Sequence, residues 1–101
     1  MSYDVQAIRK QFPILHQQIH GRPLVYLDNA ATAQKPLAVI EAITHLYTKD
    51  NANVHRGVHT LSQRSTDAME AVRSAVCAHI NAREVAEIIF TRGITDSINT
   101  V

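Results

Sequence analysis

The chain has 101 residues, 46% hydrophobic and 19% charged, which is the composition of a soluble globular protein with room for one domain. Ten basic and nine acidic residues give a net charge of +1, so neither nucleic acid nor an anionic membrane is an expected partner. No apolar run of about 18 residues is present, the first residues lack a signal-peptide pattern, and the single cysteine excludes an internal disulfide, so we expect a cytoplasmic protein.

The first half of the sequence shows two helical patterns and one short strand pattern. Ser2 or Asp4 is a suitable N-cap for a helix that runs to Phe12, where a proline stops it. A run of β-formers predicts a small strand over residues 24–27. An apolar stripe then predicts a helix over residues 36–49, with a proline in its first turn.

The second half begins with a polar loop. Residues 50–60 have no hydrophobic period and many turn formers, which is typical of a functional loop. The most regular stripe predicts a helix over residues 62–80, with Cys77 beside its packed face as a small buried residue rather than a reactive thiol. Charged side chains are expected outside that stripe at Arg64, Asp67, Glu70 and Arg73. Residues 88–91 predict a second strand, and residues 95–97 predict the start of a last helix.

The end of the sequence predicts that residues 1–101 are part of a larger domain. The last helix has about one and a half turns before Val101, and so short a helix is marginal because nucleation costs more than its few hydrogen bonds return. A strand that is apolar along its whole length also needs neighbours on both sides. We therefore expect the domain to be interrupted at the start of the helix that follows residues 88–91.

One turn has the outline of an anion site. A predicted strand is followed by Gly93 and then by the start of a helix. In this order, the backbone N–H groups of Ile94 and Thr95 would be unpaired at the positive end of the helix dipole. The Thr95 hydroxyl adds a further donor. An ordinary capped helix accounts for the same pattern, so spacing alone leaves phosphate binding open.

Two other patterns are weaker. His55 and His59 are four residues apart, but Gly57 lies between them and no third ligand is near, so we predict no metal site. The small residues Ala30 and Ala31 follow the first predicted strand. They could let a ligand lie against the backbone, or they could form an ordinary tight turn.

Five blocks of the sequence together resemble a known family. These blocks are residues 12–15, 21–36, 51–62, 80–83 and 90–93. In this order they resemble the start of SufS-type cysteine desulfurases, which belong to the class V aminotransferase group of pyridoxal phosphate enzymes. The long third block is similar to the SufS branch rather than to the IscS-like branch, and selenocysteine lyases are its close neighbours.

The resemblance implies an α/β fold, namely the N-terminal portion of a fold-type I transferase that depends on pyridoxal 5'-phosphate and is mostly helical in this portion. It implies a homodimer that takes sulfur from L-cysteine, leaving L-alanine and an enzyme persulfide. A sulfur-acceptor protein then receives the sulfur for iron–sulfur cluster assembly. The cofactor acts as the electron sink, a lysine holds it, and a cysteine thiolate attacks the substrate sulfur.

The resemblance also implies positions for binding. Ile94 and Thr95 match the residues that hold the cofactor phosphate. The family usually has Gly-Thr-Thr-Glu there, whereas this chain has Gly-Ile-Thr-Asp at residues 93–96, so position 94 offers only its N–H group. The substrate-proximal positions implied on a turn and on the loop near the dimer contact are Ala30, Ala31, His55 and Arg56.

No catalytic residue is expected within residues 1–101. Lys10, Lys35 and Lys49 match none of the family's lysine contexts, and Cys77 lies on a helix face rather than in a mobile catalytic loop. We therefore expect this chain alone to be inactive. The alternatives are a fragment of a selenocysteine lyase or of another class V member, and a small helical module that binds a protein partner.

Overall fold

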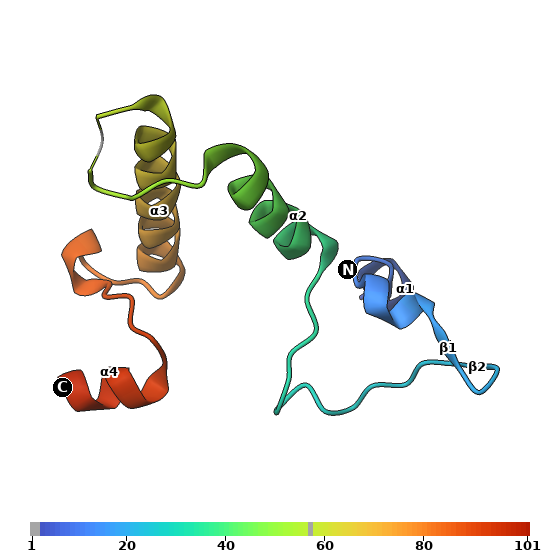
Figure 1. Ribbon diagram of the computed structural model, residues 1–101. Coiled ribbons are helices and arrows are strands. Elements are labelled where there is room, and N and C mark those ends of the chain that lie inside the picture. Colours follow the sequence, from blue (N-terminus) through green and yellow to red (C-terminus); the bar gives the residue numbers. More distant parts are fainter. Residues whose placement is uncertain (1–2, 57) are drawn as a thin grey trace. The chain divides into compact units, whose positions relative to one another are not determined.

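The computed structural model describes residues 3–56 and 58–101, and the chain divides into two compact units, Met1–Lys49 and Asp50–Val101 (Figure 1). The described residues are mostly helical and contain one short antiparallel hairpin, as the resemblance implied for this portion. None of the described helices is both long and apolar enough to cross a membrane.

The first unit opens with α1, which spans Val5–Arg9. Its N-cap is Asp4, as predicted: one carboxylate oxygen accepts the amides of Gln6 and Ala7, both at 3.0 Å. Ser2, the other predicted cap, lies outside the described residues. The helix does not continue to Phe12, because the amide of Phe12 bonds to the carbonyl three residues back and the chain tightens toward a 3₁₀ turn.

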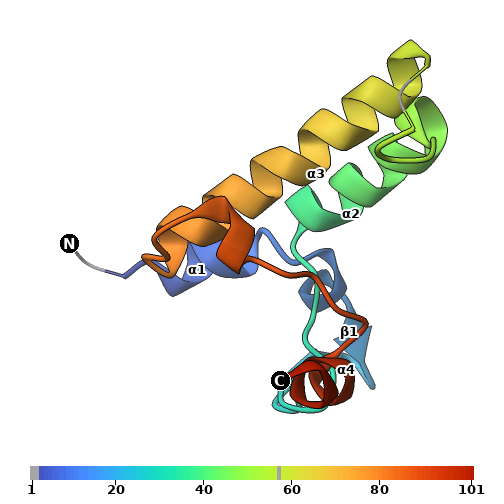
Figure 2. The ribbon, with the colours of Figure 1, turned by 90° about the vertical axis from the view of Figure 1, so that its left-hand side faces the viewer.

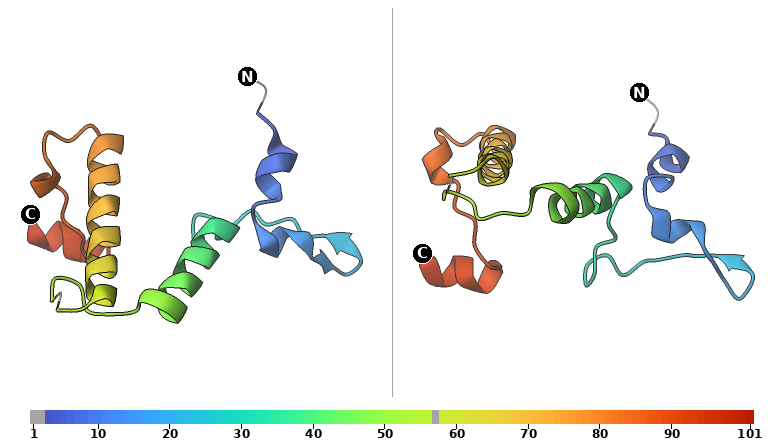
Figure 3. Two further views of the ribbon diagram at one scale, coloured as in Figure 1. Left: turned by 90° about the horizontal axis from the view of Figure 1, so that it is seen from above. Right: turned by 45° about the horizontal axis from the view of Figure 1, so that its top comes forward.

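A two-residue hairpin follows. Strand β1 (Gln18–Ile19) pairs with β2 (Arg22–Pro23) through a turn in which both His20 and Gly21 have positive φ (Figure 3). Two positive φ values are typical of the turns that match strand twist in hairpins. The strand predicted at 24–27 is wrong. After one further backbone bond, from the amide of Leu24 to the carbonyl of Gln17, residues 25–27 have no partner strand among the described residues.

Helix α2 spans Leu37–His45 and continues as a π-helical turn, Leu46–Asp50. The predicted helix over 36–49 is confirmed in its central part. Pro36 is the N-cap, with extended backbone, and not a first-turn residue. The hydroxyl of Thr48 donates to the carbonyl of Thr44 at 2.7 Å, and such bonds back to the preceding turn compete with the helical ladder where it widens.

The second unit is built on α3, a helix over Thr60–His79 (Figure 2). It begins two residues earlier than predicted, because His59 caps it by accepting the amide of Ser62 at Nδ1. Asn81 has positive φ just after its end, where the amide of Ala82 reaches back to the carbonyl of Cys77. As predicted, Cys77 is buried.

The packed face of α3 matches the predicted stripe only in part: of the stripe residues 65, 68, 69, 72, 75, 76 and 80, Ser65 is buried. The most buried side chains on it are Ser62, Ser65 and Cys77, whereas Val72 and Ile80 of the predicted stripe are 53% and 60% exposed. The reason is hydrogen bonding: the hydroxyls of Ser62 and Ser65 donate to backbone carbonyls of residues 53 and 50. These bonds bring the polar loop onto the serine face of the helix.

After α3 the chain folds back beside that helix, as both Figure 1 and Figure 3 show, through a 3₁₀ turn over Val85–Glu87. The strand predicted at 88–91 is not formed. Ile88 is buried and extended, but a strand needs a neighbour, and the described residues offer these amides no ladder. Helix α4 then spans Ile94–Thr100, starting one residue before the predicted 95–97.

Candidate functional site

The turn that begins α4 leaves its first amides open. Gly93 is the N-cap, with φ of 151°, and no side chain caps the helix. Among the described residues, the first amide of this helix that bonds to an acceptor in the turn is that of Ser97, which donates to the Gly93 carbonyl at 3.0 Å. Within the described part of the chain, the amides of Ile94 and Thr95 have no acceptor. They are thus free to donate to a bound anion.

Hydrogen bonds of side chains also stabilise this turn. The hydroxyls of Thr91 and Ser97 lie 2.6 Å apart and 3.2 and 3.1 Å from the carbonyl of Gly93, so one hydroxyl donates to the other and the second donates to that carbonyl. The carboxylate of Asp96 accepts the amide of Arg92 at 3.0 Å. This carboxylate does not contact the amides of Ile94 and Thr95 among the described residues. The backbone around Gly93 is therefore held in place without using the donors of the next two residues.

A hollow of about 390 Å³ lies over this turn. Its lining residues are Arg92, Gly93, Ile94, Thr95, Asp96 and Asn99. Nothing lies within 4 Å of the point where a Cβ on Gly93 would stand, so the backbone is open to close approach. The side chain of Thr95 is exposed and has no hydrogen-bond partner among the described residues. Two free amides, a free hydroxyl and open space suit a phosphate group.

The turn that carries Ala30 and Ala31 belongs to the first unit. The amides of Ala31 and Thr32 both bond to the carbonyl of Asp28, at 3.2 and 3.1 Å. The hydroxyl of Tyr26 donates to the carbonyl of Thr32 at 2.8 Å and so closes the turn from the other side. The two alanine residues are exposed. This is a braced tight turn with small side chains on its surface.

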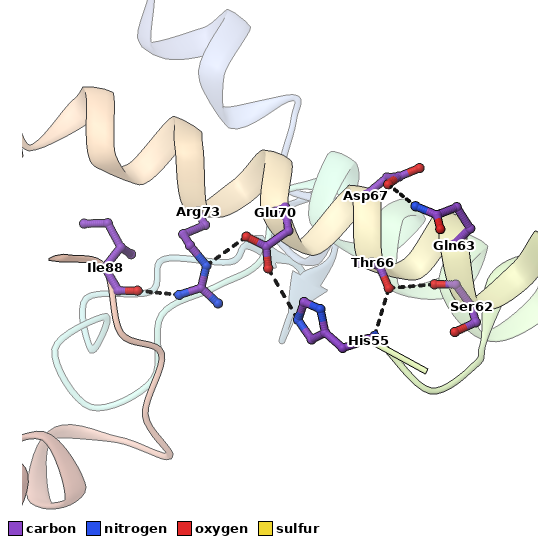
Figure 4. Close-up of polar contacts among 8 residues, drawn as sticks. All are labelled: His55, Ser62, Gln63, Thr66, Asp67, Glu70, Arg73 and Ile88. Atoms are coloured by element: carbon purple, nitrogen blue, oxygen red, sulfur yellow. Dashed lines mark hydrogen bonds and ion pairs between the residues drawn. The ribbon is translucent and has the colours of Figure 1, made fainter. Parts of the chain in front are cut away.

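The loop that carries His55 and Arg56 lies against α3 (Figure 4). His55 has φ of 55°, an unusual conformation for a residue with a side chain. Its amide donates to the hydroxyl of Thr66 at 2.9 Å, and its Nε2 lies 3.4 Å from a carboxylate oxygen of Glu70. Arg56 is exposed.

Glu70 makes a second contact, with Arg73 on the same helix. Its other carboxylate oxygen accepts from Nε of Arg73 at 3.1 Å. The Arg73 guanidinium also donates to the carbonyl of Ile88 and lies 4.9 Å from the centre of the Phe90 ring. Sequence reasoning placed Glu70 and Arg73 on the outer side of the helix. Their i, i+3 spacing was the only signal in the sequence, and it marks a solvated surface pair equally well.

Four of the predicted site residues belong to the second unit: Ile94, Thr95, His55 and Arg56. Ala30 and Ala31 belong to the first unit. Residues 3–56 and 58–101 contain no group of three or more His, Cys, Asp or Glu residues that could hold a metal ion.

Comparison with known proteins identifies the family. The sequence pattern of the family described as "Aminotransferase class-V" matches residues 25–101, which is most of the chain. The chain belongs to the class-V aminotransferase family.

Similar individual proteins are named as cysteine desulfurases. A "Probable cysteine desulfurase" of Synechocystis is 62% identical over 95 residues, which cover 94% of this chain and 23% of that protein. A cysteine desulfurase of Pectobacterium carotovorum is 54% identical over all 101 residues, which are 25% of its length. The apo structure of cysteine desulfurase from Thermococcus onnurineus NA1 matches with a TM-score of 0.83 and 37% identity, over 98% of this chain and 23% of that one. The chain thus spans about a quarter of these relatives.

Proposed function

We propose that this chain is the N-terminal part of a SufS-type cysteine desulfurase, an enzyme that takes sulfur from L-cysteine and leaves L-alanine and an enzyme persulfide. The observation that carries the proposal is similarity to proteins named cysteine desulfurase along 94% to 100% of this chain. The long loop sequence over residues 53–62 is what assigns it to the SufS branch. A selenocysteine lyase is the alternative within the same family.

The cofactor is pyridoxal 5'-phosphate, and its phosphate group is held at the start of α4. The amides of Ile94 and Thr95 donate to the phosphate, and the Thr95 hydroxyl donates a third hydrogen bond. The helix dipole adds to these bonds because its positive end faces the anion. When bound, the cofactor supplies the electron sink that the breaking of the carbon–sulfur bond requires.

The resemblance implies substrate-proximal positions in each unit, taken separately. His55 and Arg56 bring a proton-carrying ring and a cation, which suit an amino acid with a carboxylate and an ammonium group. The methyl groups of Ala30 and Ala31 are small enough to leave their turn accessible to a ligand.

The covalent steps need residues from outside this chain. Residues 50–101, which carry the proposed phosphate site, contain no lysine. Cys77 is buried, and its Sγ lies 3.7 Å from the carbonyl of Ala82, so it is poorly placed to accept sulfur. We therefore assign the cofactor-binding lysine and the sulfur-accepting thiol to sequence outside residues 1–101. The complete enzyme is a cytoplasmic homodimer that passes its sulfur to an acceptor protein for iron–sulfur cluster assembly.

The test is a chimera in which this chain replaces the matching quarter of the Synechocystis relative. With pyridoxal 5'-phosphate bound, the chimera should form alanine from L-cysteine, with one persulfide or sulfide for each alanine. L-Selenocysteine is the comparison substrate. A chimera that binds cofactor but releases alanine only from selenocysteine would support the lyase alternative, and one that binds cofactor and releases no alanine from either would contradict the proposal.

A further inference from the structure

The loop residue His55 is held in a conformation that its own sequence does not favour. Its φ of 55° lies in the left-handed region, where the Cβ is brought too close to the following carbonyl oxygen. Such a backbone conformation persists only where contacts with surrounding residues stabilise it. The surroundings of His55 therefore have to supply that support.

Two side chains one turn apart on α3 contact His55 at two different points (Figure 4). Thr66 accepts the backbone amide at 2.9 Å, and Glu70 faces the imidazole Nε2 at 3.4 Å. Residues four apart on a helix lie on one face, so the two contacts act from the same surface. A carboxylate can only accept, so Nε2 carries the proton whenever it interacts with Glu70.

Glu70 is itself fixed by a second element. Arg73 lies 3.1 Å from the other carboxylate oxygen of Glu70, and its guanidinium is anchored on the Ile88 carbonyl and on the Phe90 ring. The side chains of Arg73 and Glu70 are 19% and 42% exposed, so this ion pair is only partly shielded from water. Through Glu70 and Arg73, the contacts of His55 thus extend to the segment that leads to Gly93.

We propose that Glu70 and Thr66 are positioning residues that hold His55 in its left-handed conformation and fix the direction of its imidazole. Thr66 fixes the backbone, and Glu70, supported by Arg73, fixes the ring. The inference rests on the proposed function only in giving His55 a place near the substrate. The contacts themselves belong to this chain and are tested on it.

The experiment is nuclear magnetic resonance on the 101-residue chain, with variants Glu70→Gln and Thr66→Val. The first removes the charge beside the imidazole, and the second removes the acceptor of the His55 amide with little change of shape. Glu84→Gln is the matched control, because Glu84 lies in the same unit and its side chain has no partner among the described residues. Two quantities are followed: the exchange rate of the His55 amide, and the intraresidue amide-to-Hα cross-peak, which is strong only for positive φ.

We expect the His55 amide to exchange roughly five- to tenfold faster in both variants than in the control. The intraresidue cross-peak should weaken in both as the left-handed conformation loses population. Exchange within about twofold of the control, with an unchanged cross-peak, would overturn the inference. Loss of amide protection along α3 itself in both variants would also overturn it, because the two residues would then support the helix rather than the loop.

Alanine formation by the chimera is measured separately with Glu70→Gln. A rise in KM for cysteine larger than the fall in kcat is the expected result for a residue that orients a substrate-binding side chain. If the unmutated chimera forms no alanine, the proposed function fails, while the resonance measurements on the chain still decide whether Glu70 and Thr66 hold His55.

Discussion

At the scale of single residues, two of the three buried side chains on α3 carry hydroxyl groups. Ser62 is 1% exposed and Ser65 is 6% exposed, although both are polar. The hydroxyl of Ser62 donates to the carbonyl of residue 53, and the hydroxyl of Ser65 donates to the carbonyl of residue 50. A buried hydroxyl with a partner costs little, whereas a buried carbonyl without one costs a full desolvation penalty. These serines are therefore as structural as any apolar residue of the helix.

Replacement of Ser62 by alanine should destabilise the second unit. The change removes the hydrogen bond from Ser62 to the carbonyl of Asn53, and a typical hydrogen bond of this kind contributes about 0.5–1.5 kcal/mol. Amide exchange along α3 measures this loss as a change in opening free energy. Ser74→Ala is the control, since Ser74 is on the same helix and exposed, and it should change stability by less than about 0.5 kcal/mol. Equal effects of the two changes would mean that the Ser62 hydrogen bond contributes nothing.

At the scale of elements, the sequence predicts helices well and strands poorly. The helical stripes and the Asp4 cap depend on residues close in sequence, and all four helices lie where these local signals predict them. A strand depends on a partner that local sequence does not specify, so the β-forming runs at 24–27 and 88–91 gave no strands. The packed side of α3 was predicted only in part for the same reason, because the burial of Ser62 depends on the loop that it contacts.

The candidate site shows the same division. The open amides of Ile94 and Thr95 follow from a glycine before a helix start, which is a local pattern. The contacts of Glu70 and Arg73 join residues 15 apart or more, from His55 to Ile88, and no spacing rule predicts them. The sequence therefore locates the turn with the open amides, whereas the contacts that hold the loop around His55 are seen only in the folded unit.

The segment after Ile88 should exchange its amide protons quickly in a monomer. The amides of Ile89, Phe90 and Thr91 have no acceptor among the described residues, and Ile89 is 70% exposed. We expect exchange within about tenfold of the unstructured rate for these amides, and much slower exchange in the middle of α3. Slow exchange at residues 89–91 in a chain shown to be monomeric would contradict this assignment and indicate a paired strand.

At the scale of the whole molecule, the chain exposes more surface than compact proteins of its mass. Its accessible area is 8837 Å². Two separate compact units of half the mass each would together expose only about 6,900 Å². Among the described residues, Cys77 and Ile88 are the only buried members of the hydrophobic core. Both units therefore present apolar faces that the described residues do not cover.

The 101-residue chain should form no specific lysine adduct with pyridoxal 5'-phosphate. The chain has three lysines, and none of them matches the sequence context of the lysine that holds the cofactor in the resembling family. The measurement is incubation with the cofactor, reduction, and peptide mapping by mass spectrometry. Low and even labelling of Lys10, Lys35 and Lys49 is expected. A single specific adduct, with alanine produced from cysteine, would show that the chain is complete for catalysis and contradict the proposal.

The central claim is that the start of α4 holds the cofactor phosphate, and the dissociation constant of pyridoxal 5'-phosphate from the chimera tests it most directly. Thr95→Ala removes one hydrogen bond to a charged group and should cost about 1.5–3 kcal/mol, or roughly ten- to hundredfold in affinity. Thr100→Ala is the control, because Thr100 is at the other end of α4 and its hydroxyl donates to the Asp96 carbonyl. Equilibrium dialysis should show weaker binding for Thr95→Ala and unchanged binding for Thr100→Ala. Unchanged binding for Thr95→Ala would mean that the phosphate lies on another turn.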